Sequence, residues 1–323
     1  MPELSFENNT YSFDEQESVL ESLHRNGVPI PSSCLSGVCQ SCMMRSVQGE
    51  LPEAAQKGLK DTWRSQGFFL ACQCRTDESL SVARTDNLDL CVKATLTSIK
   101  ALSSNVIEVR MKPEQPIDYR PGQFMNFVLN DDVIRSYSVA SVPTLHEQLE
   151  FHVALMPDGK MSGWLHKEAS PGDSLSLQGP LGSCFYTSNN PQQPLLLVGT
   201  GTGLAPLYGI VRDALQARHD APIHLLHGSI EASGLYLVEA LQQLARDHAH
   251  FTYTPCTLKP GTDSDIECGD ISELTLKRHP DLKGWRVFLC GHPDTVKILQ
   301  RKVFMAGASM SDILADAFLP SQQ

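Results

Sequence analysis

The sequence lacks several features that each define a class of protein. Among its 323 residues there is no apolar run of about 18 residues, the length that a membrane-spanning helix needs. The opening stretch MPELSFENNTYSF has no basic segment followed by an apolar one, so no secretory signal is expected. Basic residues are scarce, with 26 Lys and Arg against 37 Asp and Glu, and a net charge of −11 does not suit binding to nucleic acid phosphates. The sequence therefore predicts a cytoplasmic protein that binds neither nucleic acid nor a membrane.

The acidic charge is densest at the front of the chain. Residues 1–90 carry 13 acidic and 7 basic side chains, a net charge of −6. Such acidity gives either plain solubility or a surface that docks on a basic partner, and composition leaves both open. A hydrophobic share of 41% is ordinary for a globular protein, and the length suits two or three domains.

The ten cysteines are not expected to form disulfides, because the cytosol is reducing. Cys34, Cys39 and Cys42 form a C-x4-C-x2-C pattern, and Cys72 follows 30 positions later. Thiolates at this spacing suit a plant-type [2Fe–2S] cluster, and Gly37 suits a tight loop that turns backbone amides toward the cluster sulfides. A zinc site usually has two C-x2-C pairs and fits less well, because only one is present.

The fourth ligand is a choice between Cys72 and Cys74. On a strand the two side chains point to the same side, so geometry alone leaves the choice open. This segment resembles plant-type ferredoxin domains over its whole length. The resemblance places the fourth ligand at Cys72, makes Cys74 a buried neighbour and implies a β-grasp ferredoxin domain over residues 1–88. Gln40, where many relatives carry Gly, departs from the pattern but removes no ligand.

Apolar periodicity divides the chain into three segments. The front segment predicts hairpin strands at 4–6 and 11–13, a helix at 17–25 that Gly27 ends, a helical stretch at 53–64 and a strand at 68–72. The middle segment has short strands separated by turn signals, at 92–99, 106–111, 125–129, 134–138 and 149–155, as in an antiparallel β-barrel.

The last segment alternates apolar strands with helices, as in a parallel α/β sheet. Its strands are expected at 195–198, 223–227, 251–253 and 287–290, and its helices at 207–218, 235–247 and 293–306. Polar stretches at 84–90 and 189–194 separate the three segments. The sequence thus predicts a multidomain α+β and α/β protein with domains 1–88, 89–190 and 191–323.

Two motifs in the middle segment offer the groups that a flavin nucleotide needs. Arg135, Ser136, Tyr137 and Ser138 lie on a predicted barrel strand and include a phosphate partner, a stacking ring and a hydroxyl. Gly159-Lys160-Met161-Ser162 precedes an apolar stretch, where amides at a helix N-terminus can hold a pyrophosphate. A plain turn with a Ser cap has the same pattern.

These motifs resemble the R-x-Y-S and G-x-x-S motifs of the ferredoxin–NADP reductase superfamily. The resemblance implies that Arg135 binds the FAD diphosphate, that Tyr137 packs on the isoalloxazine and that Ser138 hydrogen-bonds near N5. It also implies that residues 159–162 cradle the pyrophosphate.

The last segment has a glycine-rich turn suited to a dinucleotide. The strand 195–198 leads into Gly199-Thr200-Gly201-Thr202-Gly203-Leu204-Ala205-Pro206, where backbone can approach a phosphate closely. The turn resembles the G-T-G-x-G-x-A-P form of the same superfamily. Cys290-Gly291-His292-Pro293 resembles its C-G-x-P motif, which closes the nicotinamide pocket; the alternative for Cys290 is a buried thiol at a strand end.

The choice of nucleotide depends on charge. NADPH sites offer a cation to the 2′-phosphate, and neither Lys nor Arg occurs between Arg218 and Arg246. Glu231 can accept from ribose hydroxyls or is simply solvated. The sequence therefore predicts NADH. Asp316-Ala317-Phe318 resembles the acid-x-aromatic ending of related reductases, in which the aromatic covers the flavin; packing of Phe318 on the last helix is the alternative.

The order of the three segments resembles the reductase component of bacterial multicomponent oxygenases, of the benzoate dioxygenase reductase type. That resemblance implies hydride transfer from NADH to FAD and single electrons passing through the cluster to a protein acceptor, with an oxygenase component favoured. Ser138, Cys290 and Phe318 are the implied catalytic residues. Two alternatives stay open: the same chemistry for a non-oxygenase client such as a deoxysugar-forming dehydratase, and a redox-sensing module without turnover.

Overall fold

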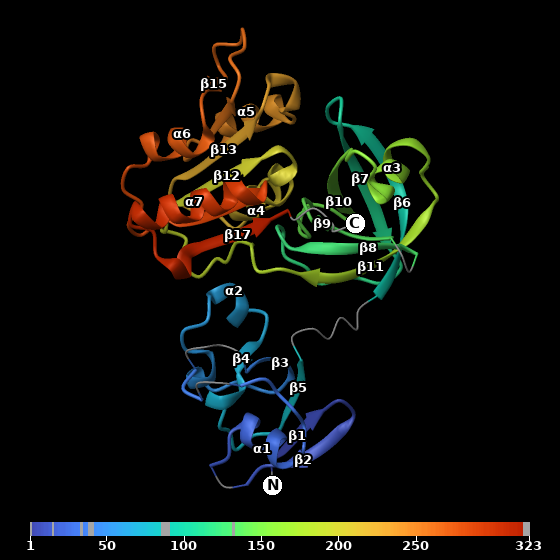
Figure 1. The fold of residues 1–323 in the computed structure, drawn as a ribbon, viewed down its shortest axis with the longest axis vertical. Coiled ribbons are helices and arrows are strands. Elements are labelled where there is room, and N and C mark those ends of the chain that lie inside the picture. Colours follow the sequence, from blue (N-terminus) through green and yellow to red (C-terminus); the bar gives the residue numbers. More distant parts are fainter. Residues whose placement is uncertain are drawn as a thin grey trace. The chain divides into compact units, whose positions relative to one another are not determined.

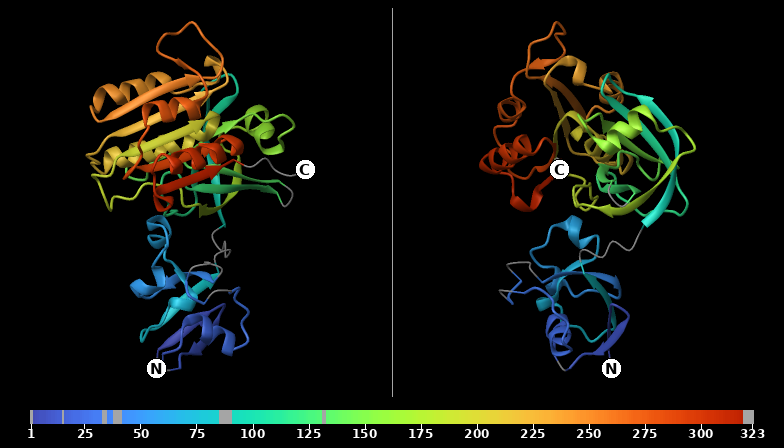
Figure 2. Two further views of the ribbon diagram at one scale, coloured as in Figure 1. Left: turned by 60° about the vertical axis from the view of Figure 1, so that its left-hand side comes forward. Right: turned by 45° about the vertical axis from the view of Figure 1, so that its right-hand side comes forward.

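The computed structural model describes residues 2–14, 16–32, 35–37, 42–84, 91–130 and 133–318. The chain forms two compact units, Met1–Leu88 and Asp89–Gln323, which we call the front unit and the main unit (Figures 1 and 2). Within the described ranges no helix is long and apolar enough to cross a membrane. The three domain boundaries drawn from the sequence stay a prediction.

The front unit is a mixed five-stranded sheet with the order β2-β1-β5-β3-β4, as in a β-grasp fold. Its strands are Glu3–Phe6 (β1), Asn9–Ser12 (β2), Met43–Gln48 (β3), Phe68–Leu70 (β4) and Leu80–Arg84 (β5); β1 pairs in parallel with β5. Helix α1 (Val19–Arg25) begins at a capping box, in which Ser18 and Glu21 bond each other's backbone amides. The predicted hairpin and first helix are confirmed.

Two predictions for the front unit are wrong in detail. The stretch 53–64 is not one helix but a 3-10 turn, η1 (Glu53–Gln56), followed by the short helix α2 (Asp61–Arg64). Gly58 lies between them with φ of +81°, a conformation that a helix does not contain. The strand expected at 68–72 ends at Leu70, and the 3-10 turn η2 (Ala71–Gln73) follows it. Of the predicted linker 84–90, Arg84 belongs to β5 and residues 85–90 lie outside the described ranges.

The main unit begins with an antiparallel β-barrel, with strand order β10-β7-β6-β11-β8-β9. The strands are Cys91–Ala101 (β6), Val106–Pro113 (β7), Phe124–Asn130 (β8), Val133–Ser138 (β9), Leu149–Ala154 (β10) and Ser174–Leu181 (β11), with helix α3 (Lys160–Lys167) between the last two. An antiparallel bridge between Val139 and Phe151 joins the two edge strands and closes the barrel. The sequence pattern missed β11.

Strand β10 is buried on both of its faces. Leu149, Phe151 and Val153 point into the barrel core, as alternation requires. Glu150 and His152 point the other way, yet both are buried as well. The outer face of β10 is therefore covered by the rest of the main unit.

The second half of the main unit is a parallel sheet with the order β15-β14-β13-β12-β16-β17. Its strands are Leu195–Thr200 (β12), Ile223–Ser229 (β13), Phe251–Thr257 (β14), Glu267–Cys268 (β15), Arg286–Gly291 (β16) and Ile313–Ala317 (β17). Its helices are Leu204–Gln216 (α4), Val238–Asp247 (α5), Ile271–Arg278 (α6) and Pro293–Met305 (α7). The sequence pattern missed the two edge strands β15 and β17 and helix α6.

Alternation along β12 explains how helices cover both faces of this sheet (Figure 2). Leu195 and Leu197 pack in one core cluster with apolar residues of α4 and α5. Leu196 and Val198 pack in another with residues of α6 and α7. A strand buried on both faces has a continuous apolar sequence, and this run allowed β12 to be predicted from the sequence.

Helix α4 packs directly on the barrel. A Cβ placed on Gly209 would come within 2.9 Å of the Ala140 carbonyl oxygen, just after β9. Arg212, one turn further along α4, also donates to the Ala140 carbonyl at 2.5 Å. The barrel and the parallel sheet therefore share an interface near the end of β9.

Candidate functional site

Two of the four predicted cluster ligands belong to the described residues. Cys42 precedes β3 and Cys72 lies in η2; Cys34 and Cys39 lie outside the described ranges. The Ala71 amide donates to the Cys42 carbonyl at 3.0 Å. Burial raises the pKa of Cys42 to about 11, and the neighbouring Cys72 thiol adds to this rise in the pKa. Thiolate ligation here would need the compensating charge of bound iron.

The loop between Cys34 and Cys39 is described at residues 35–37, and this part lies against Cys72. The Gln73 side-chain amide donates to the Leu35 carbonyl at 3.0 Å and lies 3.5 Å from the Cys72 sulfur. Gly37 has φ of +79°, and a Cβ there would meet the Gln73 side chain at 3.0 Å. A paired set of thiols beside a tight glycine loop fits a [2Fe–2S] cluster.

Cys74 differs from Cys72 in its local backbone structure. The assumption that both lie on one strand is wrong, because the 3-10 turn η2 carries Cys72 and ends just before Cys74. Both side chains pack in the core of the front unit, where Cys74 is 0% exposed and Cys72 is 5% exposed. Burial raises the pKa of Cys74 to about 12, which suits an inert core thiol.

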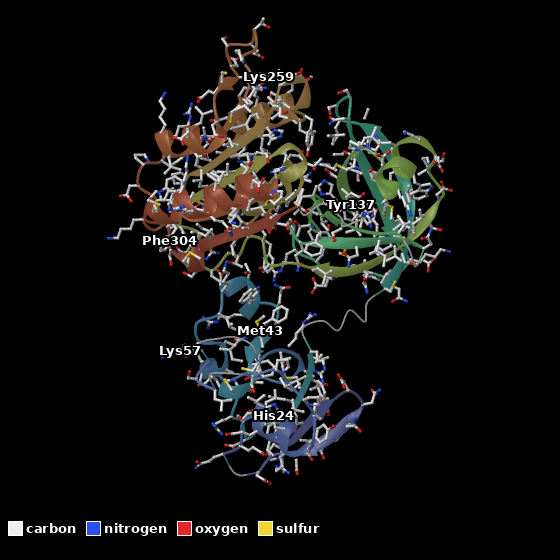
Figure 3. The ribbon with its side chains drawn as sticks, viewed as in Figure 1. His24, Met43, Lys57, Tyr137, Lys259 and Phe304 are labelled. Atoms are coloured by element: carbon white, nitrogen blue, oxygen red, sulfur yellow. The ribbon has the colours of Figure 1, made fainter. Side chains whose placement is uncertain are left out.

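Strand β9 carries the predicted flavin motif along the barrel edge that faces the parallel sheet. Tyr137 is half-buried and its ring lies 4.6 Å from that of Phe127, at an interplanar angle of 50° (Figure 3). Arg135 is half-buried, and its guanidinium donates to the adjacent Ile134 carbonyl at 2.6 Å. Ser136 is exposed and donates to Asn126 at 2.8 Å.

The turn before α3 is held by the side chain of Ser162. Its hydroxyl accepts from the Met156 amide at 3.2 Å and donates to the Gly159 carbonyl at 3.3 Å. A Cβ on Gly159 would come within 2.3 Å of this hydroxyl, so the turn needs glycine. Met161 is buried in the barrel core, and Lys160 is exposed at the helix start. The Ser162 bonds thus hold the turn, and the N-terminus of α3 lies at the surface.

The glycine-rich turn lies where the order of the parallel strands reverses, between β12 and β16. A Cβ on Gly203 would come within 2.3 Å of the Cys290 carbonyl oxygen, and one on Gly291 within 2.6 Å of the Thr200 carbonyl oxygen. The His292 amide donates to the Thr200 hydroxyl at 3.1 Å. The two predicted nucleotide motifs therefore form one structure at the point where such sheets bind ligands.

The barrel motif and the C-G-x-P motif meet at Asp316. Asp316 on β17 pairs in register with Cys290 on β16, and the Ser138 hydroxyl donates to its carboxylate at 3.3 Å. Burial raises the pKa of Asp316 to about 6, against the opposing hydrogen bond from Ser138. The Phe318 amide donates to the Gly291 carbonyl at 2.9 Å. Three segments far apart in sequence thus supply a hydroxyl, a carboxyl and a thiol to one place.

A basic residue near Glu231 was missed. Lys259, which follows β14, forms an ion pair with Glu231 at 2.7 Å, and its amide donates to the Ile230 carbonyl (Figure 3). Lys259 lies 28 positions after Glu231, outside the stretch between Arg218 and Arg246 that contains neither Lys nor Arg. The parallel pairing of β13 with β14 brings the two strand ends together and is the signal that could have revealed the pair.

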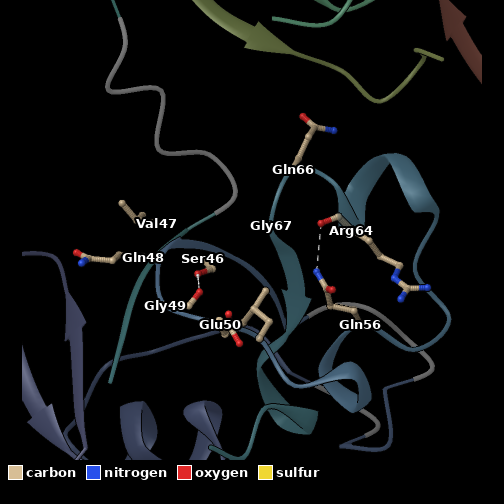
Figure 4. A pocket seen from close by; sticks show the side chains of 10 residues that line it. Ser46, Val47, Gln48, Gly49, Glu50, Gln56, Arg64, Gln66 and Gly67 are labelled. Carbon is tan, nitrogen blue, oxygen red and sulfur yellow. Dashed lines mark hydrogen bonds between the residues drawn. The ribbon is translucent and has the colours of Figure 1, made fainter. Parts of the chain in front are cut away.

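One pocket of the front unit contains none of the predicted site residues. It has a volume of about 580 Å³ and is lined by the β3–η1 loop, Arg64 and Gln66 among others (Figure 4). The Ser46 hydroxyl donates to the Gly49 carbonyl at 3.3 Å, and the Gln56 side chain to the Arg64 carbonyl at 3.3 Å. These bonds hold the loop that forms the pocket wall.

Three family models match successive parts of the chain. A 2Fe-2S iron-sulfur cluster binding domain matches residues 5–77, an oxidoreductase FAD-binding domain residues 93–186, and an oxidoreductase NAD-binding domain residues 197–301. These matches define the class: the chain is a flavin- and iron–sulfur-dependent oxidoreductase that uses NAD(P)H.

Relatives over the full length define the family. The ferredoxin–NAD(P)(+) reductase component of the naphthalene 1,2-dioxygenase system of Pseudomonas putida is 31% identical over 97% of both chains. The reductase subunit of an aromatic O-demethylase of Amycolatopsis is 29% identical over 87% of both chains. A cytochrome P450 reductase of Amycolatopsis has a solved structure that matches with a TM-score of 0.69 and 27% identity over 99% of both chains. The chain belongs to the family of ferredoxin–NAD(P)+ reductase components, which pass electrons from NAD(P)H through FAD and a [2Fe–2S] cluster.

Proposed function

We propose that this chain is the NADH-dependent reductase component of an oxygenase system. The observation that supports it best is the meeting of Ser138, Asp316 and Cys290 between the barrel and the parallel sheet. A flavin ring bound on β9 and a nicotinamide bound between β12 and β16, where the strand order reverses, would both reach these three side chains. Relatives named for dioxygenase, O-demethylase and monooxygenase systems support the oxygenase assignment.

The proposed roles follow the motifs. FAD supplies hydride acceptance and single-electron release, and the cluster supplies one-electron transfer. Ser138 and Asp316 hold a proton at the barrel edge, Cys290 forms the wall of the nicotinamide pocket and Phe318 covers the flavin. The proposed cluster ligands are Cys34, Cys39, Cys42 and Cys72; the proposed flavin contacts are Arg135, Ser136, Tyr137, Ser138 and residues 159–162; the proposed dinucleotide contacts are residues 199–203, Glu231, Cys290, Gly291 and Pro293.

The immediate electron acceptor can be an oxygenase or a separate small ferredoxin, as the name of the naphthalene system relative suggests. The test is anaerobic stopped-flow reduction of purified proteins of both kinds by the NADH-reduced chain. The proposal expects one of them to be reduced fast enough to sustain oxygenase turnover. Turnover with cytochrome c but with neither acceptor would favour a non-oxygenase client. Failure with every acceptor would favour a redox-sensing module.

The NADH preference predicts the effect of E231Q. In the proposed site Glu231 accepts from ribose hydroxyls and neutralises Lys259, the cation that a 2′-phosphate would otherwise meet. Removing the carboxylate charge frees Lys259, so the ratio of kcat/KM for NADPH to that for NADH should rise about tenfold. E273Q is the matched control, since exposed Glu273 on α6 pairs with half-buried Lys302 on α7, away from the turn. An unchanged ratio in E231Q would remove Glu231 from the nucleotide site.

A further inference from the structure

A histidine is buried directly beneath the glycine-rich turn, in the half of β13 nearest that turn. His227 lies on β13, is 0% exposed, and stands in register beside Gly199 of β12, the neighbouring strand (Figure 1). A buried polar side chain in such a sheet is retained at a cost unless its ring nitrogens are bonded. The contacts of the ring therefore indicate its role.

Both ring nitrogens of His227 have partners. Nε2 lies 3.3 Å from the Gly201 carbonyl oxygen, and Nδ1 lies 3.4 Å from the Tyr253 hydroxyl. A carbonyl can only accept, so Nε2 carries the hydrogen and donates it, while Nδ1 accepts from Tyr253. Burial lowers the pKa of His227 to about 4, so the ring is neutral and this tautomer is maintained near neutral pH.

The bond to Gly201 fixes the direction of one peptide group in the turn. Gly201 has φ of +55° and no atom within 4 Å of where a Cβ would lie, so side-chain packing does not hold it. Its carbonyl accepts from His227 below and from the Leu204 amide within the turn. Because a trans peptide points its N–H opposite to its C=O, the Thr202 amide faces away from His227 and out of the sheet. Outward-facing amides in such a turn bind phosphate.

His227 is itself held by a second layer of buried rings. The Tyr236 ring meets it edge-on, with centroids 5.5 Å apart at 84°. The Tyr236 hydroxyl contacts His152 Nδ1 at 3.2 Å, and His152 Nε2 contacts Glu150 at 3.1 Å on barrel strand β10. The ring therefore cannot turn away from Gly201 without disturbing the interface with the barrel.

We propose that His227 is a positioning residue for the dinucleotide: its Nε2–H holds the Gly201 carbonyl inward so that the Thr202 amide faces the pyrophosphate. This inference depends on the assignment of the glycine-rich turn to NADH made above. His227 is fully buried beneath the turn, so in this proposal it acts on the nucleotide only through Gly201. Its removal should therefore weaken binding and leave the rate at saturation nearly unchanged.

The test compares H227F with H227Q in FAD-loaded protein. Calorimetric titration with NAD+ should give a Kd about tenfold higher for H227F, because the carbonyl loses a buried donor and the peptide can rotate. H227Q, whose amide nitrogen can reach the position of Nε2, should recover most of the affinity. The KM for NADH should follow the Kd, and kcat should stay within about twofold.

H224F is the matched control. His224 is another buried histidine three positions earlier on β13, bonded to His279 at 2.7 Å and Thr254 at 2.8 Å, away from the turn. It should leave the Kd for NAD+ unchanged. Wild-type affinity in H227F, or an equal loss in H224F, would overturn the positioning role. If H227F does not fold, H227N against H227Q makes the same comparison, because the shorter amide stops short of Gly201. Absence of NAD+ binding by the wild-type chain would instead contradict the proposed function.

Discussion

C72S is expected to abolish electron transfer to one-electron protein acceptors while NADH still reduces the flavin. Cys72 contacts the Cys42 thiol and lies against the loop that holds residues 35–37, so its loss removes a ligand at the centre of the proposed site. Mutation of a residue that only supports a metal ligand lowers metal affinity or activity about 10–100-fold. Loss of the ligand itself should therefore lower the rate of cytochrome c reduction at least about 100-fold. Ferricyanide reduction, which can draw on the flavin directly, should stay within about twofold.

C74S is the control for this prediction. Cys74 is a buried cysteine two positions away, in the core of the same unit. Its replacement should lower the melting temperature modestly and leave the visible spectrum of the cluster and cytochrome c reduction in place. If C74S lost the cluster and C72S kept it, the ligand assignment would be reversed.

G203A should disrupt the proposed nucleotide site by a steric clash alone, because the substitution removes no charged group. The added Cβ would lie 2.3 Å from the Cys290 carbonyl oxygen and 2.8 Å from the Gly291 Cα, both backbone atoms that cannot rotate aside. The turn after β12 and the turn after β16 must move apart. A displacement of the reacting groups by about 1 Å lowers the reaction rate about 100-fold. We therefore expect kcat/KM for NADH to fall at least about 100-fold, in steady-state assays with ferricyanide.

The bound FAD and the cluster spectrum of G203A should match those of the wild type, because neither proposed site includes Gly203. G261A is the control, since a Cβ on exposed Gly261 would meet nothing within 4 Å. It should change kcat/KM by less than about twofold. Near-normal kcat/KM in G203A would mean that the close approach to Cys290 is not needed for nucleotide use.

The sequence predicted the elements whose residues follow one strong local pattern. The apolar run of β12, buried on both faces, and the alternation in β10 are patterns of this kind. Edge strand β17 was missed because its sequence, ILADA, mixes apolar and acidic residues whose burial depends on β16. The stretch 53–64 has helical periodicity, but Gly58 turns the chain between two short pieces.

The sequence predicted the motifs of the candidate site, but it did not predict the contacts between residues far apart in the chain. Ser138 and Asp316 are 178 positions apart, and only closure of the barrel against the parallel sheet brings them together. Lys259 became relevant to Glu231 through the pairing of β13 with β14. His227 has no motif around it, and its contact with Gly201 depends on strand register. Such contacts follow from tertiary structure, which local periodicity does not encode.

The most direct test of the electron path is an anaerobic titration of the FAD- and cluster-loaded protein with NADH, followed by visible absorption, with NADPH in parallel. The account predicts that NADH bleaches overlapping flavin and iron–sulfur bands together, and that NADPH acts much more weakly. A stronger response to NADPH would contradict the proposed role of Glu231. Absence of the flavin or the cluster band from fully loaded protein, or bands that NADH does not bleach, would contradict the central claim.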